Sequence, residues 1–275
     1  MSGADGQGCV RGGGLRCALR KGDIMNDGEK NSWKTEYRVV ALASVLLVFA
    51  LGFLHSGRST SAASAGEITG TVKLDGAAPH QRAIDMAKEP SCAAVHKDKP
   101  ITTENVVAGA NGGLANVVVY ISQGLTGNEA ASSQPAQIDQ KGCQYIPHVV
   151  AVNPGQHMKI LNSDQTSHNI HPQATKNSEW NKSQLSGAPP LDVVWANEEI
   201  SIPVKSNIHP WMHAYIVIVK GPYGVSDDSG SFKLDNVPPG AYTLTAWQET
   251  YGTQTQNVTV AAGKPATVSF TFKAK

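Results

Sequence analysis

Residues 206–212 of this chain read Ser-Asn-Ile-His-Pro-Trp-Met, and a strand-like stretch stands on either side of them. The flanking residues 200–204 and 214–219 are rich in Val and Ile, which favour β-strands. A loop held between two strands is a rigid mount for side chains. Within this loop His209 offers an imidazole nitrogen and Met212 a soft thioether, and both are good ligands for copper. The segment therefore predicts a β-rich protein with a candidate metal-binding loop.

A second His-containing segment reads Ser-His-Asn-Ile-His at residues 167–171. It follows a strand, turn, strand pattern, in which Asn153-Pro154-Gly155 separates two β-branched runs. We expect His168 to be the second imidazole ligand. Further candidates to complete the donor set, if the geometry allows, are His171, His213 and His148.

Together the two segments resemble the copper loops of cupredoxins of the amicyanin type. In that family a Cys is followed by His three residues later and by Met six residues later, and His209 and Met212 match this spacing. The resemblance covers residues 142–220 and implies a Greek-key β-sandwich. It also implies a copper ion held by His168, His209 and a weak axial Met212.

Ser206 stands where the family has its Cys. A serine hydroxyl stays protonated near neutral pH and cannot form the copper–sulfur bond that gives a blue site its colour and electronic coupling. Strong blue absorption with Cu(II) is therefore not expected of this chain. Two alternatives remain open, namely copper held by His and Met without a thiolate, and a scaffold that has lost its metal.

The C-terminal residues carry a second resemblance. Residues 228–232 (Asp-Ser-Gly-Ser-Phe) and 237–244 (Val-Pro-Pro-Gly-Ala-Tyr-Thr-Leu) are similar to the carboxypeptidase-regulatory-like domain, a transthyretin-like (Ig-like) β-sandwich. The pattern predicts that the runs at 258–260 and 267–272 close this unit as a hairpin. The whole chain is similar to exported bacterial proteins of the methylamine-utilisation type.

The C-terminal unit alone has too few strands for a closed two-sheet core. We therefore expect a discontinuous sandwich formed by residues 66–124 plus 221–275, with the cupredoxin-like domain at 125–220 inserted in it. In the alternative, two domains follow one another and residues 66–220 are all cupredoxin-like. Either way the predicted fold class is all-β.

The N-terminal residues indicate export. A leader at 1–38 supplies positive charges, and residues 39–65 contain an apolar run that ends near Ala63-Ser64-Ala65, a small-residue cleavage pattern. An uncleaved N-terminal membrane anchor is the alternative, and Met25 is an alternative start. We expect a periplasmic or secreted protein, in which Cys92 and Cys143 form a disulfide. Two separate buried thiols are the alternative to that disulfide.

Composition and missing motifs restrict the function. The formal net charge is +1, so no basic field would gather nucleic acid. The sequence has no His-Glu-x-x-His, Gly-x-Ser-x-Gly or phosphate-loop motif, and we expect no enzymatic activity. The leading hypothesis is an exported copper protein, a copper carrier or an electron-transfer-related protein, with a redox or copper-delivery protein as partner. The alternative is a metal-free envelope scaffold that binds protein or carbohydrate.

Overall fold

The structure is a computed structural model that describes residues 64–127 and 136–275. The predictions of a leader, of a hydrophobic segment up to residue 63 and of the start codon lie outside these residues. The described residues all belong to one compact unit. Within the described ranges no helix has the length and apolar character needed to cross a membrane.

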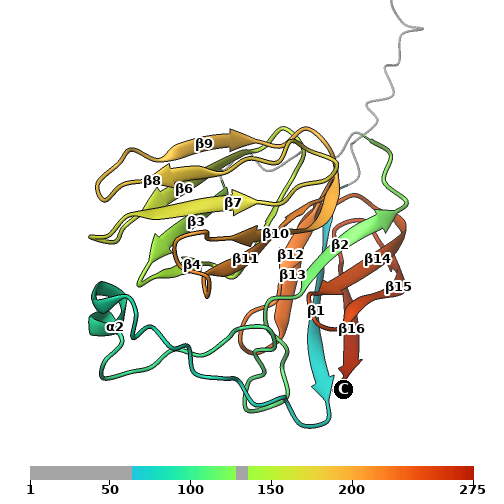
Figure 1. Cartoon of the computed structure of the whole chain (residues 1–275). Helices are drawn as coiled ribbons and strands as arrows, with labels where there is room; N and C mark the ends of the chain where they lie inside the picture. The colour runs from blue at the N-terminus through green and yellow to red at the C-terminus, as the bar shows by residue number, and fades with distance from the viewer. Residues whose placement is uncertain (1–63, 128–135) are drawn as a thin grey trace, which may run out of the picture. The chain divides into compact units, whose positions relative to one another are not determined.

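The all-β prediction is confirmed, because strands account for almost all regular structure in the described residues (Figure 1). A short helix, α2 (Pro90–Val95), lies between the first two strands. The strands are β1 (Gly66–Asp75), β2 (Val118–Gln123), β3 (Ala136–Lys141), β4 (Gln144–Ile146), β5 (Val149–Val152), β6 (His157–Asn162), β7 (His168–Pro172), β8 (Lys182–Gln184), β9 (Leu191–Val194), β10 (Glu199–Lys205), β11 (His213–Ile218), β12 (Tyr223–Val225), β13 (Ser231–Val237), β14 (Gly240–Gln248), β15 (Gly252–Val260) and β16 (Pro265–Lys273).

One sandwich combines strands from both ends of the described chain, and we call it the split sandwich. Its sheets have the orders β13-β1-β16 and β12-β2-β14-β15. β1 pairs with β13 in antiparallel and with β16 in parallel, while β2 lies between β12 and β14. Strand pairing therefore joins the early strands to the C-terminal ones, as the discontinuous arrangement requires. The domain limits near 125 and 220 stay a prediction.

The predicted closing hairpin is wrong, because β15 and β16 do not pair with each other. β15 pairs with β14 in one sheet, and β16 pairs with β1 in the other. Val268, Phe270 and Phe272 alternate along β16 and are buried in the shared core. The turn between the strands thus carries the chain across the sandwich, so that each strand covers the core from its own side.

The middle sandwich consists of β3–β11. Its five-stranded sheet has the order β5-β11-β10-β7-β8, and its four-stranded sheet has the order β4-β3-β6-β9. Gly155 at the predicted turn has φ +79°, a conformation that glycine adopts without strain. The stretch 174–190 between β7 and β9 contains the short strand β8. The core between the sheets includes Ile138, Ile160, Ile170, Ile202 and Ile216.

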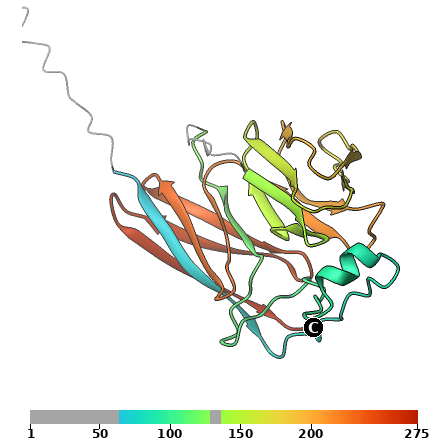
Figure 2. The ribbon, with the colours of Figure 1, turned by 90° about the vertical axis from the view of Figure 1, so that its left-hand side faces the viewer.

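The two sandwiches lie side by side (Figures 1 and 2), and a separate apolar cluster, which we call the seam, joins them. All four residues of β5 are buried. Alternate side chains on a strand point to opposite faces, and both faces of β5 are covered. Val150 and Val152 enter the middle core, whereas Val149 and Ala151 face the seam. The split sandwich contributes buried residues to this cluster from β2 and β14, namely Val118 and Trp247.

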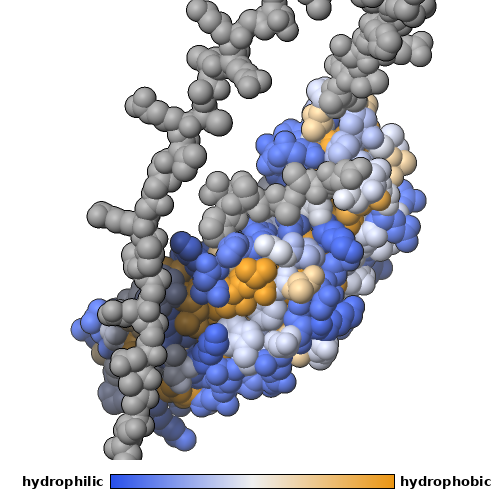
Figure 3. All heavy atoms as spheres, turned by 90° about the horizontal axis from the view of Figure 1, so that it is seen from above, coloured by the Kyte–Doolittle hydropathy of each residue, from blue (hydrophilic) through white to orange (hydrophobic). Residues whose placement is uncertain are grey.

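The face seen in Figure 3 is mainly hydrophilic, with small hydrophobic areas among the polar groups. Large hydrophobic side chains that are exposed in the described residues are Val95, Ile146, Leu185, Val194 and Ile208. They come from distant parts of the chain, and single exposed apolar residues are normal in soluble proteins.

Glu199 at the start of β10 makes stability depend on pH. Burial would raise the pKa of its carboxyl, but hydrogen bonds from the Thr175 backbone, the Asn177 side chain and the Lys176 backbone outweigh burial and lower the pKa to about 2. The folded pKa lies below the unfolded value, so this stabilisation is complete above pH ~4.5 and is lost as pH falls toward 2.

We expect Glu199→Gln to lower the free energy of unfolding at pH 7 by up to about 3 kcal/mol and to flatten its pH dependence in that window. Urea unfolding from pH 2.5 to 7 checks this. Glu198→Gln is the control, since Glu198 forms an exposed pair with Lys220 and such pairs contribute less than about 1 kcal/mol. Parallel pH curves for wild type and Glu199→Gln would contradict the prediction.

Candidate metal centre

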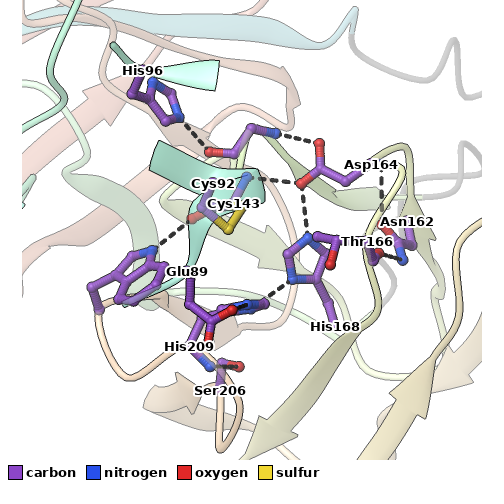
Figure 4. The surroundings of a disulfide bond; sticks show 12 residues. Glu89, Cys92, His96, Cys143, Asn162, Asp164, Thr166, His168, Ser206 and His209 are labelled. Atoms are coloured by element: carbon purple, nitrogen blue, oxygen red, sulfur yellow. Dashed lines mark hydrogen bonds and ion pairs between the residues drawn. A yellow bond between two sulfur atoms is a disulfide. The ribbon is translucent and has the colours of Figure 1, made fainter. Parts of the chain in front are cut away.

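The structure brings the two predicted imidazoles into contact. His168 begins β7, and His209 lies in the loop between β10 and β11. Their Nδ1 atoms are 2.9 Å apart, and the rings are 0% and 1% exposed. Figure 4 shows both rings beneath α2, with the two nitrogens facing each other. In this geometry one Nδ1 donates a hydrogen bond and the other accepts it.

Asp164 fixes the orientation of His168. Its Oδ2 lies 2.8 Å from His168 Nε2, and its carboxylate also accepts the backbone N–H groups of Gly142 and Cys143. Burial would raise the pKa of Asp164, but the hydrogen bond from His168 and those from the Cys143 and Gly142 backbone lower it. An ionised Asp164 keeps the proton of a neutral His168 on Nε2, which leaves the Nδ1 lone pair directed at His209.

The environment of His209 favours its neutral form. Burial and the neighbouring His168 lower its pKa, while Glu89 and Asp164 act in the opposite direction. Metal binding at Nδ1 requires the remaining proton to be on Nε2. Glu89 Oε2 lies 3.9 Å from that nitrogen, close enough to favour a proton there. His168 is thus held with the lone pair of Nδ1 free to bind an ion. His209, whose Nδ1 donates to His168, has to move its proton to Nε2 before both nitrogens can bind one ion.

Ser206 ties the loop together instead of offering a ligand. Its hydroxyl donates to Asn169 Oδ1 at 2.9 Å and accepts the backbone N–H of His209 at 3.0 Å. Asn169 Oδ1 also accepts the backbone N–H groups of Asn207 and Ile208. The amide of Asn169, next to His168, therefore holds the His209 loop in register with β7.

Met212 is buried in the core of the middle sandwich and is 2% exposed. Its backbone N–H donates to the carbonyl of His209 at 2.9 Å, which closes the loop as a turn. A tetrahedral ion with metal–nitrogen bonds of about 2.0 Å separates two ligand nitrogens by about 3.3 Å. The 2.9 Å between the two imidazoles is a few tenths of an ångström shorter than that value, so a small separation of the rings would admit an ion between His168 and His209. Met212 as the third donor stays a prediction.

His171 lies apart from this pair. Its Nδ1 is 3.1 Å from Asn207 Oδ1 and its Nε2 is 2.7 Å from Glu179 Oε1. His168 is three residues earlier on the same strand, so period-2 alternation puts the two rings on opposite faces of β7. His148 and His213 also lie elsewhere, in a group with Glu249.

The disulfide predicted between Cys92 and Cys143 is confirmed, with an S–S distance of 2.03 Å. It ties α2 to the turn between β3 and β4, beside Asp164 (Figure 4). A hydrogen bond of 2.6 Å between His96 Nε2 and the Gly142 carbonyl adds a second attachment. The segment that carries Glu89 therefore covers His209. The sulfur of Cys143 lies close to Asp164 and His168, but in the disulfide it is not a thiolate.

Sequence reasoning missed both Asp164 and the covering segment. Asp164 lies in the turn after β6, where its N–H donates to Asn162 Oδ1 and the Asn162 amide donates to the Thr166 carbonyl. The polar run Asn-Ser-Asp shortly before His168 was a usable signal, since ligating imidazoles commonly pair with a carboxylate. Nothing in the sequence around residues 84–104 indicates where that segment packs.

A hollow of about 430 Å³ lies beside the His209 loop. Its apolar lining includes Pro210, Trp211 and Ile84, and Ser206 and Met212 line it as well. Trp211 Nε1 donates to the Cys143 carbonyl at 3.1 Å. Pro210 and Trp211 thus line the surface next to the imidazole pair, whereas the His209 ring itself is buried.

Comparison with known families supports the resemblance of the C-terminal residues to the carboxypeptidase-regulatory-like domain. Residues 209–273 match the family model of the carboxypeptidase regulatory-like domain, which confirms the similarity seen at 223–272. Among curated proteins no significant match is found. The likeness to proteins of the methylamine-utilisation type stays a prediction.

Similar solved structures include copper proteins. A purple cupredoxin from Nitrosopumilus maritimus is 19% identical with a TM-score of 0.27, covering 30% of this chain and 99% of its own. An oxidised point mutant of amicyanin is 14% identical with a TM-score of 0.29, covering 37% and 98%. The copper-containing nitrite reductase from Thermus scotoductus SA-01 is 15% identical with a TM-score of 0.30, and the match spans 35% of this chain and 25% of the reductase.

Proposed function

We propose that this chain is an exported, non-catalytic copper-binding protein that holds the ion with His168 and His209 and takes Met212 as a third donor. The observation that carries the proposal is the pair of buried Nδ1 atoms 2.9 Å apart. Two imidazoles and a thioether form a soft donor set that favours Cu(I). The role of the site would be to bind this soft cation reversibly.

The burial of the pair favours a copper-holding role over electron transfer at an exposed imidazole edge. His209 is 1% exposed, and the disulfide-tethered segment with Glu89 lies over it. The apolar surface next to the imidazole pair that a partner protein could contact is formed by Pro210 and Trp211, which line the adjacent hollow. We propose a copper-delivery protein as that partner, docking at this surface and receiving or donating the ion when the covering segment moves.

The copper site has a direct test. We expect the exported full chain to bind one equivalent of Cu(I) against a competing chelator, and the His168→Ala/His209→Ala variant to bind at least about 100-fold more weakly, because both nitrogen ligands are gone. A reductant without thiols keeps the disulfide intact. His171→Gln is the matched control, since its ring contacts Asn207 and Glu179 instead. Equal Cu(I) affinity in wild type and the double variant would contradict the proposal.

One observation favours the alternative, a metal-free scaffold. His168, His209 and Ser206 all have hydrogen-bond partners in the structure, so the pair is satisfied without an ion, and buried polar groups that are paired cost little. In this alternative the imidazole pair only fastens the loop to β7. The same titration decides, because a scaffold takes up no Cu(I) with or without the two histidines.

A further inference from the structure

We propose that the protein has a second metal site beside the seam between the two sandwiches, where the imidazoles of His148 and His213 and the carboxylate of Glu104 bind a divalent transition-metal ion of the zinc type, and Glu249 orients His148. His148, His213 and Glu249 each offer a ligand atom within 4.8 Å of the others, and Glu104 Oε2 lies 3.9 Å from His148 Nδ1. The site goes beyond the proposed copper function and does not depend on it.

The strongest indication is that two imidazole nitrogens of this group lack partners. His148 Nδ1 and His213 Nε2 are buried, and neither has a hydrogen bond to any described residue. A buried polar atom without a partner costs about 1–3 kcal/mol, so native structures rarely keep one without a ligand, ion or water. In the His168–His209 pair, by contrast, the facing ring nitrogens are hydrogen-bonded.

The second imidazole nitrogen of each residue is already held. His148 Nε2 lies 2.6 Å from Glu249 Oε1, and His213 Nδ1 lies 3.0 Å from the Trp211 carbonyl. The bond to a carbonyl requires His213 Nδ1 to carry the proton, which puts the lone pair on Nε2. The two rings pack edge to face with centroids 5.0 Å apart. His213 is thus prepared to bind a cation, and a contraction of up to about 1.5 Å would bring the donor atoms from within 4.8 Å of one another to the spacing of a tetrahedral site.

The seam also concentrates negative charge that a cation would neutralise. The Glu249 side chain is 3% exposed, and Glu104 Oε2 lies 3.9 Å from the unpartnered His148 Nδ1. Burial raises the pKa of the Glu104 carboxyl, and the carboxylates of Glu249 and Asp228 raise this pKa further. His148 and His213 act in the opposite direction. Two imidazoles with one carboxylate form a donor set that binds Zn²⁺. The carboxylate beside the unpartnered nitrogen of His148 is that of Glu104, while Glu249 holds His148 through its other nitrogen.

The fold explains why these residues meet. Tyr215 and Val217 face the seam from β11, so alternation puts His213, two residues before Tyr215, on the same face. Trp247 faces the seam from β14, and Glu249 is two residues further on. A cavity of about 10 Å³, lined by Glu104 and His213 among others, leaves space of about one water molecule beside the group. An ion here would join the two sandwiches.

Zinc titration of the exported full chain tests the site. After removal of metal with a chelator, we expect one equivalent of Zn(II) to bind and to raise the thermal unfolding midpoint, because only the folded chain assembles the ligands. His213→Gln should abolish this equivalent, and Glu104→Gln should weaken it by at least about 10–100-fold, since losing a carboxylate ligand costs no less than a change near a ligand does. Since His213 is half-buried and only its Nδ1 is hydrogen-bonded, Gln is a mild replacement.

The matched control is His171→Gln, which should bind Zn(II) as the wild type does. Co(II) in place of Zn(II) gives a spectroscopic signature that His213→Gln should remove, and an unchanged unfolding midpoint of the chelator-treated variant shows that its fold is intact.

Absence of Zn(II) binding at about 100 µM, a concentration far above the Kd of structural zinc sites, would overturn the proposal. So would an equivalent that persists in His213→Gln and disappears in the His168→Ala/His209→Ala variant, because it would place the ion at the other site.

Discussion

The copper(II) complex of Ser206→Cys is expected to be intensely coloured, whereas the copper(II) complex of the wild type is expected to show no strong visible band. A cysteine at this position is the one ligand that the loop lacks, and the copper–thiolate bond is the source of blue-copper colour. The site can accept the change. Ser206 Oγ accepts the backbone N–H of His209, and a thiolate can accept the same bond. Asn169 Oδ1 keeps its bonds from Asn207 and Ile208 when the hydroxyl donor is gone.

The control is Ser206→Ala, which removes the hydroxyl and supplies no sulfur, and which should stay colourless with copper(II). Absorption spectra of the three proteins at equal copper loading make the comparison. Mass analysis should find one more free thiol in the Cys variant than in the wild type, so that the Cys92–Cys143 disulfide is known to be intact. A Cys variant that binds copper at His168 and His209 and remains colourless would show that the side chain at 206 does not point at the ion.

The parts of the fold and site that could be predicted depend on short-range patterns. The loop containing His209 and Met212 could be located because strand signals stand on both sides of it, and His168 because it follows a strand, turn, strand unit. The same alternation that identifies a strand also separates His171 from His168, and the sequence alone could have shown this. Cys92 and Cys143 could be paired because an exported protein seldom keeps two free thiols.

The remaining features depend on which distant segments pack together. Asp164 acts on His168 only because the backbone of Gly142 and Cys143 holds its carboxylate in place. The seam group takes residues from positions 104, 148, 213 and 249, and no spacing rule links four segments from two sandwiches. The error over β15 and β16 has the same origin, because a short turn between two strands is compatible with a hairpin and with a crossing between sheets.

Removal of the disulfide by Cys92→Ser/Cys143→Ser is expected to lower the free energy of unfolding by about 4 kcal/mol, the loop-closure entropy for cysteines 51 residues apart. It should also free the segment that covers His209. α2 has six residues, and its first residue is a proline, so it is too short to be stable without its attachments. Once the disulfide is gone, the described contacts of this segment near the imidazole pair include the His96–Gly142 hydrogen bond, the approach of Glu89 to His209 and the apolar cluster that contains Met86 and Trp211.

Two measurements separate the effects. Urea unfolding gives the loss of stability, and hydrogen exchange followed by mass spectrometry reports whether residues 84–104 open at a urea concentration where β10 and β11 stay protected. The control is Glu89→Gln, which keeps the disulfide and removes only the carboxylate 3.9 Å from His209 Nε2; its exchange in residues 84–104 should match the wild type. Under the proposed function, copper uptake should be faster in Cys92→Ser/Cys143→Ser, because α2 no longer has to move away from the imidazole pair first. If exchange in residues 84–104 stays as slow as in the oxidised wild type, the segment is held by its packing and the disulfide does not control access to the site.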